Sequence, residues 1–69
     1  MNVALFKYYA TKNGDTMQKI ASVLGKANQT LANYLYGHRG DFSRADIATL
    51  KKRWHLTNDQ VAEIFYNEV

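Results

Sequence analysis

The sequence predicts an all-α protein made of five short helices. Apolar residues recur at the i, i+3 and i+4 spacing of amphipathic helices in five successive segments. The chain contains no proline, and glycines or capping residues separate these segments. A length of 69 residues suits one domain, so residues 1–69 are expected to form a single compact unit.

The first helix is expected over residues 3–12. Its inner face is predicted to carry Leu5, Phe6 and Tyr9. Asn13-Gly14 ends this helix, and Thr16 caps a second helix that ends near Leu24.

A sharp turn at Gly25 is predicted between the second and third helices. A glycine at a helix end adopts the left-handed conformation without steric cost. Asn28 is expected to cap the third helix, which runs from about Gln29 to Tyr36. The apolar stripes of the two helices comprise Ile20, Ala21, Leu24, Leu31, Tyr34 and Leu35. Two short amphipathic helices joined by such a turn indicate a helix-turn-helix.

A loop beginning at Gly37 leads to the last two helices. Ser43 is expected to cap the fourth helix, with Asp46 adding negative charge to its first turn. Thr57 and Gln60 predict a capping box for the fifth helix. The expected core positions are Ile47, Leu50, Trp54, Val61, Ile64 and Phe65.

Residues 16–37 resemble the helix-turn-helix of lambda-repressor-like DNA-binding domains, the family of phage Cro and repressor proteins. The positions that this family reserves for apolar or small residues are filled by Ile20, Ala21, Gly25, Leu31 and Tyr34. Gly37 closes the third helix as in the family. Asp15 departs from the pattern, because an apolar residue is more usual there, and Met17 stands where a glutamine often contacts phosphate. The resemblance implies a five-helix DNA-binding fold, with the helix-turn-helix formed by the second and third helices.

Positive charge is concentrated in the segment that contains this motif. All nine Lys and Arg lie between Lys7 and Arg53 with only three Asp among them, a balance of +6. Asp59, Glu63 and Glu68 give the remaining tail a charge of −3. A basic face of this kind attracts a polyanion such as DNA, although a solvated charged surface is the simpler alternative.

The resemblance implies that the third helix enters the major groove of duplex DNA. The residues expected to read bases are Asn28, Gln29, Asn33, Thr30 and Ala32. Asn and Gln can pair with adenine, whereas Thr or Ala can contact a thymine methyl group. Two alternatives remain: Asn28 serves only as a helix cap, and Asn33 is only a solvated residue.

Phosphate contacts are expected from Gln18, Lys26, Tyr36, Arg39 and Arg44. For Tyr36, packing under the loop is an equal alternative.

The resulting hypothesis is a phage or prophage transcriptional regulator, Cro-like or repressor-like, that occludes polymerase. It would bind a pseudo-palindromic operator as a weak homodimer strengthened on DNA. The expected dimer contacts are Trp54, His55, Leu56 and Phe65. The alternative is a protein-binding module of the same fold, similar to an antirepressor or antitoxin. A nucleoid-like protein without operator preference is a further alternative.

An enzyme is not expected, because the two imidazoles, His38 and His55, lie in separate interhelical segments without a catalytic or metal-binding pattern. No cofactor, metal, small-molecule ligand or membrane contact is expected. The absence of cysteine suits the cytoplasm of a bacterial host, with the protein on the nucleoid when bound. Helical spacing places the five tyrosines in the core or an interface rather than against single-stranded nucleic acid.

Overall fold

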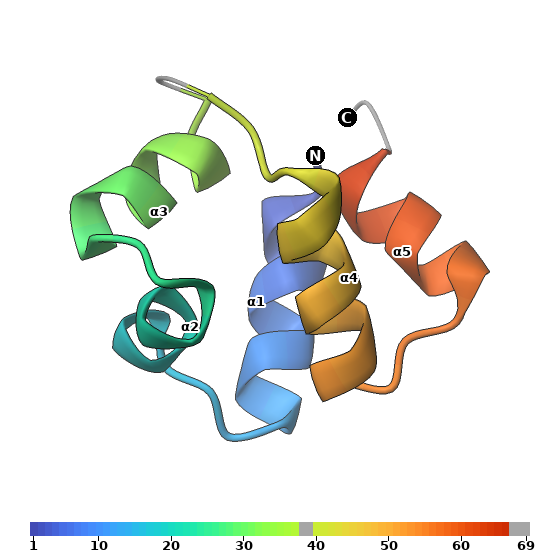
Figure 1. The fold of residues 1–69 in the computed structure, drawn as a ribbon. Coiled ribbons are helices and arrows are strands. Elements are labelled where there is room, and N and C mark those ends of the chain that lie inside the picture. The colour runs from blue at the N-terminus through green and yellow to red at the C-terminus, as the bar shows by residue number, and fades with distance from the viewer. Residues whose placement is uncertain (38–39, 67–69) are drawn as a thin grey trace.

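Five helices follow one another in the computed structural model, which describes residues 1–37 and 40–66. They are α1 (Val3–Lys12), α2 (Met17–Leu24), α3 (Asn28–Leu35), α4 (Arg44–Arg53) and α5 (Asn58–Phe65). Figure 1 shows α1 and α4 in the middle of the molecule, with α2 and α3 on one side and α5 on the other. α2 packs against α3, while α5 packs against both α1 and α4. The predicted all-α fold class is confirmed, and the described ranges contain no strand.

Side-chain caps begin α2, α4 and α5 as the sequence predicts. The Thr16 hydroxyl accepts a hydrogen bond from the Lys19 amide at the start of α2. Ser43 and Asp46 form a reciprocal capping box on α4, and Thr57 and Gln60 form another on α5. Each cap satisfies amides that have no partner within the helix. These helix starts are therefore determined by local sequence.

The turn between α2 and α3 confirms one prediction and corrects another. Gly25 ends α2 in the left-handed conformation, with φ of 69°, as predicted. The residue at the N-cap of α3 is Ala27, not Asn28, and no side chain caps this helix. Asn28 is already the first helical residue, whereas a capping side chain requires extended backbone. The predicted Asn28 cap is therefore wrong.

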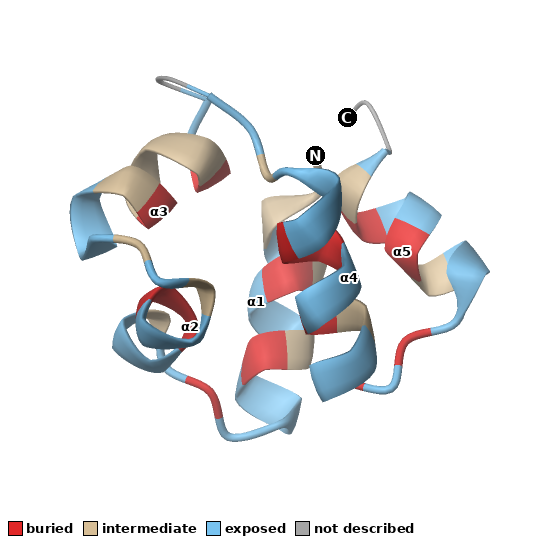
Figure 2. Cartoon of the chain, in the orientation of Figure 1, coloured by how far each residue is buried: buried red, intermediate tan, exposed pale blue. Residues whose placement is uncertain are grey.

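Phe6 of α1 lies at the centre of the core and is fully buried. Its ring centroid is 5.5 Å from that of Phe42, 5.2 Å from that of Trp54 and 6.1 Å from that of Phe65. These aromatic contacts join α1 to the loop before α4, the end of α4 and the end of α5. Figure 2 shows the buried positions on the inward faces of the helices. The buried apolar residues are Phe6, Ala10, Ile20, Ala21, Leu31, Leu35, Ile47, Leu50, Trp54, Leu56, Val61 and Ile64.

The connection between α4 and α5 corrects part of the expected dimer surface. Trp54 and Leu56 are only 4% and 6% exposed, so both belong to the core of one copy rather than to a surface for a second. The Leu56 amide donates to the Lys51 carbonyl at 2.9 Å, which closes α4 and turns Leu56 inward. His55 is exposed between them, and Phe65 is half-buried. Only His55 and Phe65 of the expected dimer contacts remain accessible.

His55 adopts a conformation that favours glycine. Its φ is 53°, and it is the only non-glycine residue with positive φ among the described residues. Because a side chain in this conformation costs roughly 1–2 kcal/mol, His55→Gly should raise the free energy of unfolding by about 0.5–1 kcal/mol after the added chain entropy of glycine is subtracted. Urea unfolding measures this change. His55→Ala keeps the Cβ atom and should not stabilise, so equal effects of the two variants would contradict the explanation.

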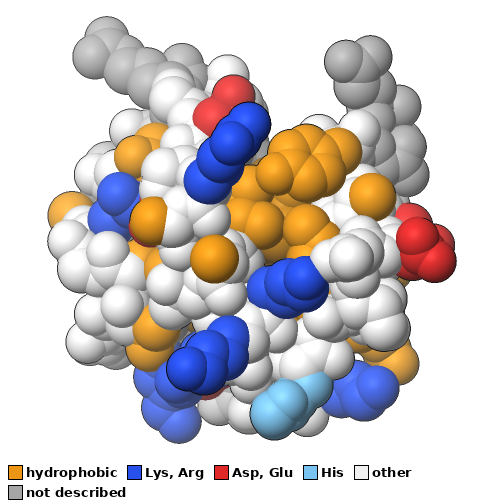
Figure 3. Space-filling view, turned by 45° about the vertical axis from the view of Figure 1, so that its right-hand side comes forward, with side chains coloured by type: hydrophobic (Ala, Val, Ile, Leu, Met, Phe, Trp, Pro, Cys, Tyr) orange, Lys and Arg blue, Asp and Glu red, His pale blue; other side chains and the backbone are white. Residues whose placement is uncertain are grey.

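One group of accessible apolar side chains lies beside the start of α4 and the end of α5. Figure 3 shows them as a continuous patch in a hollow of the surface. The hollow is lined by Met1, Asp41, Phe42, Ile47, Phe65 and Tyr66. One residue of its lining, Phe42, packs against Tyr34 of α3, with ring centroids 5.3 Å apart. None of the helices within the described ranges combines the length and the apolar character that a membrane crossing requires.

Candidate nucleic-acid interface

α3 has one anchored face and one accessible face. Leu31 and Leu35 are buried and hold the helix against the rest of the molecule. At 3.6 residues per turn, Gln29, Asn33 and Tyr36 fall on the opposite side. The period of the helix thus separates the residues that pack from those that can meet a ligand.

Gln29 and Asn33 are joined on this outer face. The Gln29 Nε2 atom donates a hydrogen bond to the Asn33 Oδ1 atom at 3.1 Å. The bond uses one amide proton of Gln29 and one acceptor site of Asn33, and each side chain keeps further donor and acceptor capacity. The structure therefore brings two of the predicted base-reading side chains together as one amide surface.

The other three predicted base-reading residues flank this pair. Asn28 is exposed at the first position of α3, while Thr30 and Ala32 are half-buried on either side of the outer face. None of the five is buried, so all can be reached from outside. Asn28 lies closer to the packed side of the helix than Gln29 and Asn33 do.

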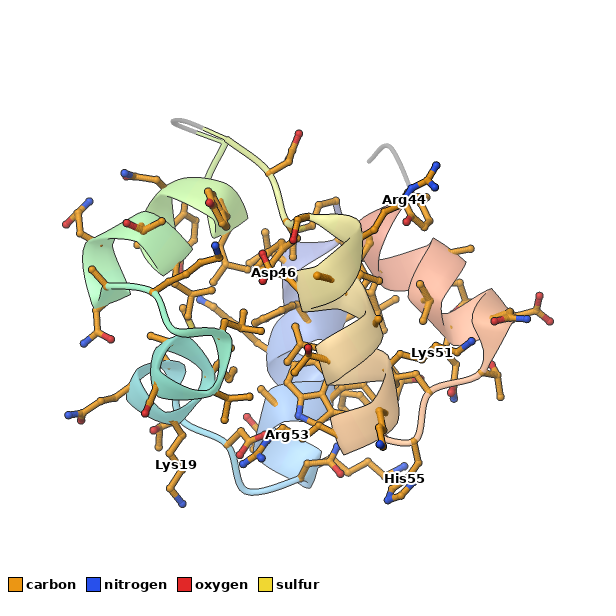
Figure 4. All side chains as sticks on the ribbon, viewed as in Figure 1. Lys19, Arg44, Asp46, Lys51, Arg53 and His55 are labelled. Atoms are coloured by element: carbon orange, nitrogen blue, oxygen red, sulfur yellow. The ribbon has the colours of Figure 1, made fainter. Side chains whose placement is uncertain are left out.

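The start of α2 offers polar and cationic groups at the surface. Gln18 is exposed in the first turn of α2, where free backbone amides carry partial positive charge. Lys19 is also exposed, and its Nζ atom lies 3.4 Å from the Gly14 carbonyl oxygen. Figure 4 shows Lys19 pointing away from the body of the protein. Lys19 was not among the phosphate contacts expected from the sequence, although its place beside a predicted helix start was a usable signal.

Lys26, in the turn before α3, is engaged within the protein. Its Nζ atom lies 3.5 Å from the Asp46 carboxylate and 5.5 Å from the centroid of the Tyr34 ring. Only 25% of the Lys26 side chain is exposed. Asp46 also accepts from the Ser43 amide in the α4 capping box. Lys26 therefore links the turn to α4, and its charge is not free for a phosphate in the way that the sequence suggested.

Arg44 extends away from α3. Figure 4 shows its side chain running from the start of α4 toward the end of α5. Arg44 takes this direction because it lies on the same side of α4 as Lys51, seven residues later. In this orientation its side chain points away from α3, and its expected phosphate contact stays a prediction. Arg39, another expected contact, and His38 lie outside the described residues.

A lysine amine lies over the ring of two exposed tyrosines. The Lys7 Nζ atom lies 5.2 Å from the centroid of the Tyr36 ring at the end of α3, and the Lys12 Nζ atom lies 6.0 Å from that of Tyr8. Tyr8, Tyr36 and Tyr66 are all more than half exposed and do not belong to the core, whereas Tyr9 packs against the core and Tyr34 packs against Phe42. Tyr36 thus remains available on the outer side of α3, with Lys7 of α1 beside it.

A buried carboxylate fixes the start of α2 to the end of α4. Asp15 accepts hydrogen bonds from Nε and Nη2 of Arg53 at 2.8 Å each and from Nε1 of Trp54 at 2.7 Å. The hydrogen bonds from Arg53 lower the pKa of Asp15 from 3.8 to about 2, although burial acts in the opposite direction. The departure of Asp15 from the family pattern therefore corresponds to a structural ion pair. It positions α2, and with it the neighbouring α3.

Comparison of the chain with protein-family models, with curated proteins and with solved structures found no match. Within the described part of the chain, no three His, Asp or Glu side chains come together as metal ligands would. The accessible face of α3 is the candidate site because it carries the hydrogen-bonded amides of Gln29 and Asn33.

Proposed function

We propose that the protein binds duplex DNA in a sequence-specific manner through α3 and regulates transcription. The observation that carries the proposal is the hydrogen-bonded pair of Gln29 and Asn33 on the accessible face of a helix anchored by Leu31 and Leu35. In this proposal α2 and α3 form a lambda-repressor-like helix-turn-helix, with α3 in the major groove.

Amide side chains suit the reading of base edges. A glutamine or asparagine can donate to adenine N7 and accept from adenine N6, which contributes roughly 1–3 kcal/mol of discrimination. The bond between Gln29 and Asn33 orients both amides before DNA arrives, so less side-chain freedom is lost on binding. The pair would therefore read adjacent bases as a unit.

Phosphate contacts would hold α3 in register on both sides. Gln18, Lys19 and the free amides of the first turn of α2 supply one group of contacts. Tyr36 and Lys7, joined by their cation–π contact, supply the other. The net charge of +3 adds a sequence-independent attraction that weakens as salt rises. In a phage or prophage, occupation of an operator by this protein would exclude polymerase from an overlapping promoter.

Selection of binding sites from random duplex DNA, repeated at two salt concentrations, tests the proposal. Enrichment of a defined sequence, bound more weakly at the higher salt concentration, would support it. Salt-sensitive binding without enrichment would overturn sequence specificity and favour a nucleoid-like protein. Absence of salt-sensitive binding would overturn DNA binding itself and favour a protein partner.

Gln29→Ala should weaken binding to the selected site by roughly 1–3 kcal/mol and relax the preference at one base pair, because it removes a base contact. Lys19→Ala should instead weaken all sequences similarly and lower the salt slope by about one. Fluorescence anisotropy with the selected and a scrambled duplex measures both effects. Lys52→Ala, on the exposed side of α4, is the matched control and should change neither. An equal loss on both duplexes for Gln29→Ala would contradict its role.

A further inference from the structure

The exposed side of α1 carries tyrosine rings that neighbouring side chains hold in place. The Tyr8 ring is 56% exposed, packs edge-on against the Tyr9 ring at 5.2 Å and has the Lys12 amine 6.0 Å from its centroid. The Tyr36 ring, 51% exposed at the end of α3, has the Lys7 amine of α1 at 5.2 Å. Because these contacts restrict the rings, little side-chain freedom is lost when a planar group stacks on them.

The two pairs of tyrosine and lysine lie on one surface. Lys7, Tyr8 and Lys12 are exposed and fall within roughly 140° of the circumference of α1, and Lys7 brings in the ring of Tyr36. These four residues, Lys7, Tyr8, Lys12 and Tyr36, are called the α1 surface. It alternates aromatic rings with amines.

A second hollow, the α1–α2 hollow, begins at Lys7 and extends along α1 to the start of α2. Its volume is about 460 Å³, and its lining includes Thr11 and Met17. Sites of roughly 300–1,000 Å³ accommodate small organic groups. The hollow therefore offers room for a base or a sugar next to an anion held by Lys7.

This side of the molecule is cationic. α1 and α3 contain no Asp or Glu. The one acid among residues 1–40 is Asp15, which lines the α1–α2 hollow. Its carboxylate is buried and accepts hydrogen bonds from Arg53 and Trp54, so it does not cancel the charges of the α1 lysines. A surface of this charge attracts a polyanion.

We infer that the α1 surface binds single-stranded nucleic acid, with bases stacked on Tyr8 and Tyr36 and phosphates beside Lys7 and Lys12. A single strand offers free base faces together with a regular series of negative charges, which is the combination that rings interleaved with amines recognise. In a duplex the base faces are stacked on one another and are closed to these rings. An acidic peptide would match the lysines but would leave the exposed tyrosines without a role.

The inference differs from the expectation drawn from helical spacing, which placed all five tyrosines in the core or an interface. That expectation does not hold for Tyr8 and Tyr36, because more than half of each is exposed. Single-strand binding does not depend on the proposed function, although Lys7 and Tyr36 serve in both. A bound strand would therefore compete with a duplex for these two residues and leave Gln29 free.

Fluorescence anisotropy with labelled oligothymidylate and oligouridylate of about 12 nucleotides tests the inference. Tyr8→Ala should weaken binding by about 5- to 100-fold, because one base loses its stacking partner. Tyr8→Phe keeps the ring and should bind within about twofold of the unmodified chain. Lys12→Ala should lower the salt slope by about 0.7, the value for one phosphate contact of a single strand. Tyr66→Ala is the matched control, because Tyr66 is 63% exposed outside the α1 surface, and it should change neither quantity.

Circular dichroism verifies that each variant folds. Binding of either oligonucleotide with this order of variants would support the inference, and a preference for one would identify the strand as DNA or RNA. No binding of either up to about 1 mM, or equal losses for Tyr8→Ala and Tyr66→Ala, would overturn it. Displacement of the oligonucleotide by polyglutamate at an equal concentration of charge would also overturn it and favour an acidic protein partner. Single-strand binding without duplex binding would overturn only the proposed function, whereas duplex binding without single-strand binding would overturn only this inference.

Discussion

Replacement of Leu31 by alanine is expected to lower the free energy of unfolding by about 2–5 kcal/mol. Leu31 is fully buried on the inner face of α3, and its truncation removes apolar contact and leaves a cavity. A domain of this size has a total stability of only about 5–15 kcal/mol, so the loss is a large fraction of the whole. Urea unfolding followed by far-UV circular dichroism, which reports secondary structure, measures it.

Gln29→Ala is the matched control for Leu31→Ala, because it truncates an exposed side chain on the same helix. Its effect on unfolding should stay within about 0.5 kcal/mol. If Leu31→Ala unfolded at the same urea concentration as the unmodified chain, α3 would not pack through this face. The outer face assigned to Gln29 and Asn33 would then be wrong as well.

Local features of the fold were predictable from the sequence. The capping boxes at Ser43 and Thr57 and the left-handed turn at Gly25 depend on residues within one helical turn, and the structure confirms them. The start of α3 was not predictable in the same way. A capping residue at Asn28 is a statistical preference of the isolated segment, whereas the tertiary packing starts the helix one residue earlier than predicted.

The periodicity of the sequence could not predict contacts between distant segments. Asp15 meets Arg53 and Trp54 across 38 and 39 residues, and no local pattern indicates that pairing. Leu56 was expected at a surface because it lies in a loop, but the left-handed backbone at His55 turns it inward. The contacts and burial of these residues depend on how the helices pack together rather than on which segments are helical.

In the candidate site, too, local features were predictable from the sequence and contacts between distant segments were not. The shared face of Gln29 and Asn33 follows from a spacing of four residues on a helix, and the structure brings the two side chains into contact. The ion pair of Lys26 with Asp46 and the direction of Arg44 depend on the position of α4, which helical spacing does not specify. Charge alone therefore identified the basic segment but not which of its cations face α3.

Asp15→Asn should lower the free energy of unfolding at pH 7 by about 1–2 kcal/mol, because it removes the charge that accepts from Arg53 and Trp54. The figure is modest because 40% of the Arg53 side chain is exposed and solvent screens the pair. Asp41→Asn, which neutralises an exposed carboxylate, is the control and should change stability by less than about 0.5 kcal/mol. Urea unfolding at a series of pH values compares the three proteins.

The lowered pKa of Asp15 determines how the free energy of unfolding changes with pH. Because the pKa of Asp15 falls from 3.8 to about 2 on folding, the unfolded chain binds the proton more readily. The stabilisation is therefore fully present above the unfolded pKa and is lost as the pH falls through about 2. The stability difference between the unmodified chain and Asp15→Asn should be constant from neutral pH to about pH 5 and shrink progressively below pH 4. A difference that persisted undiminished at pH 2 would mean that the shape of the side chain, rather than its charge, ties α2 to α4.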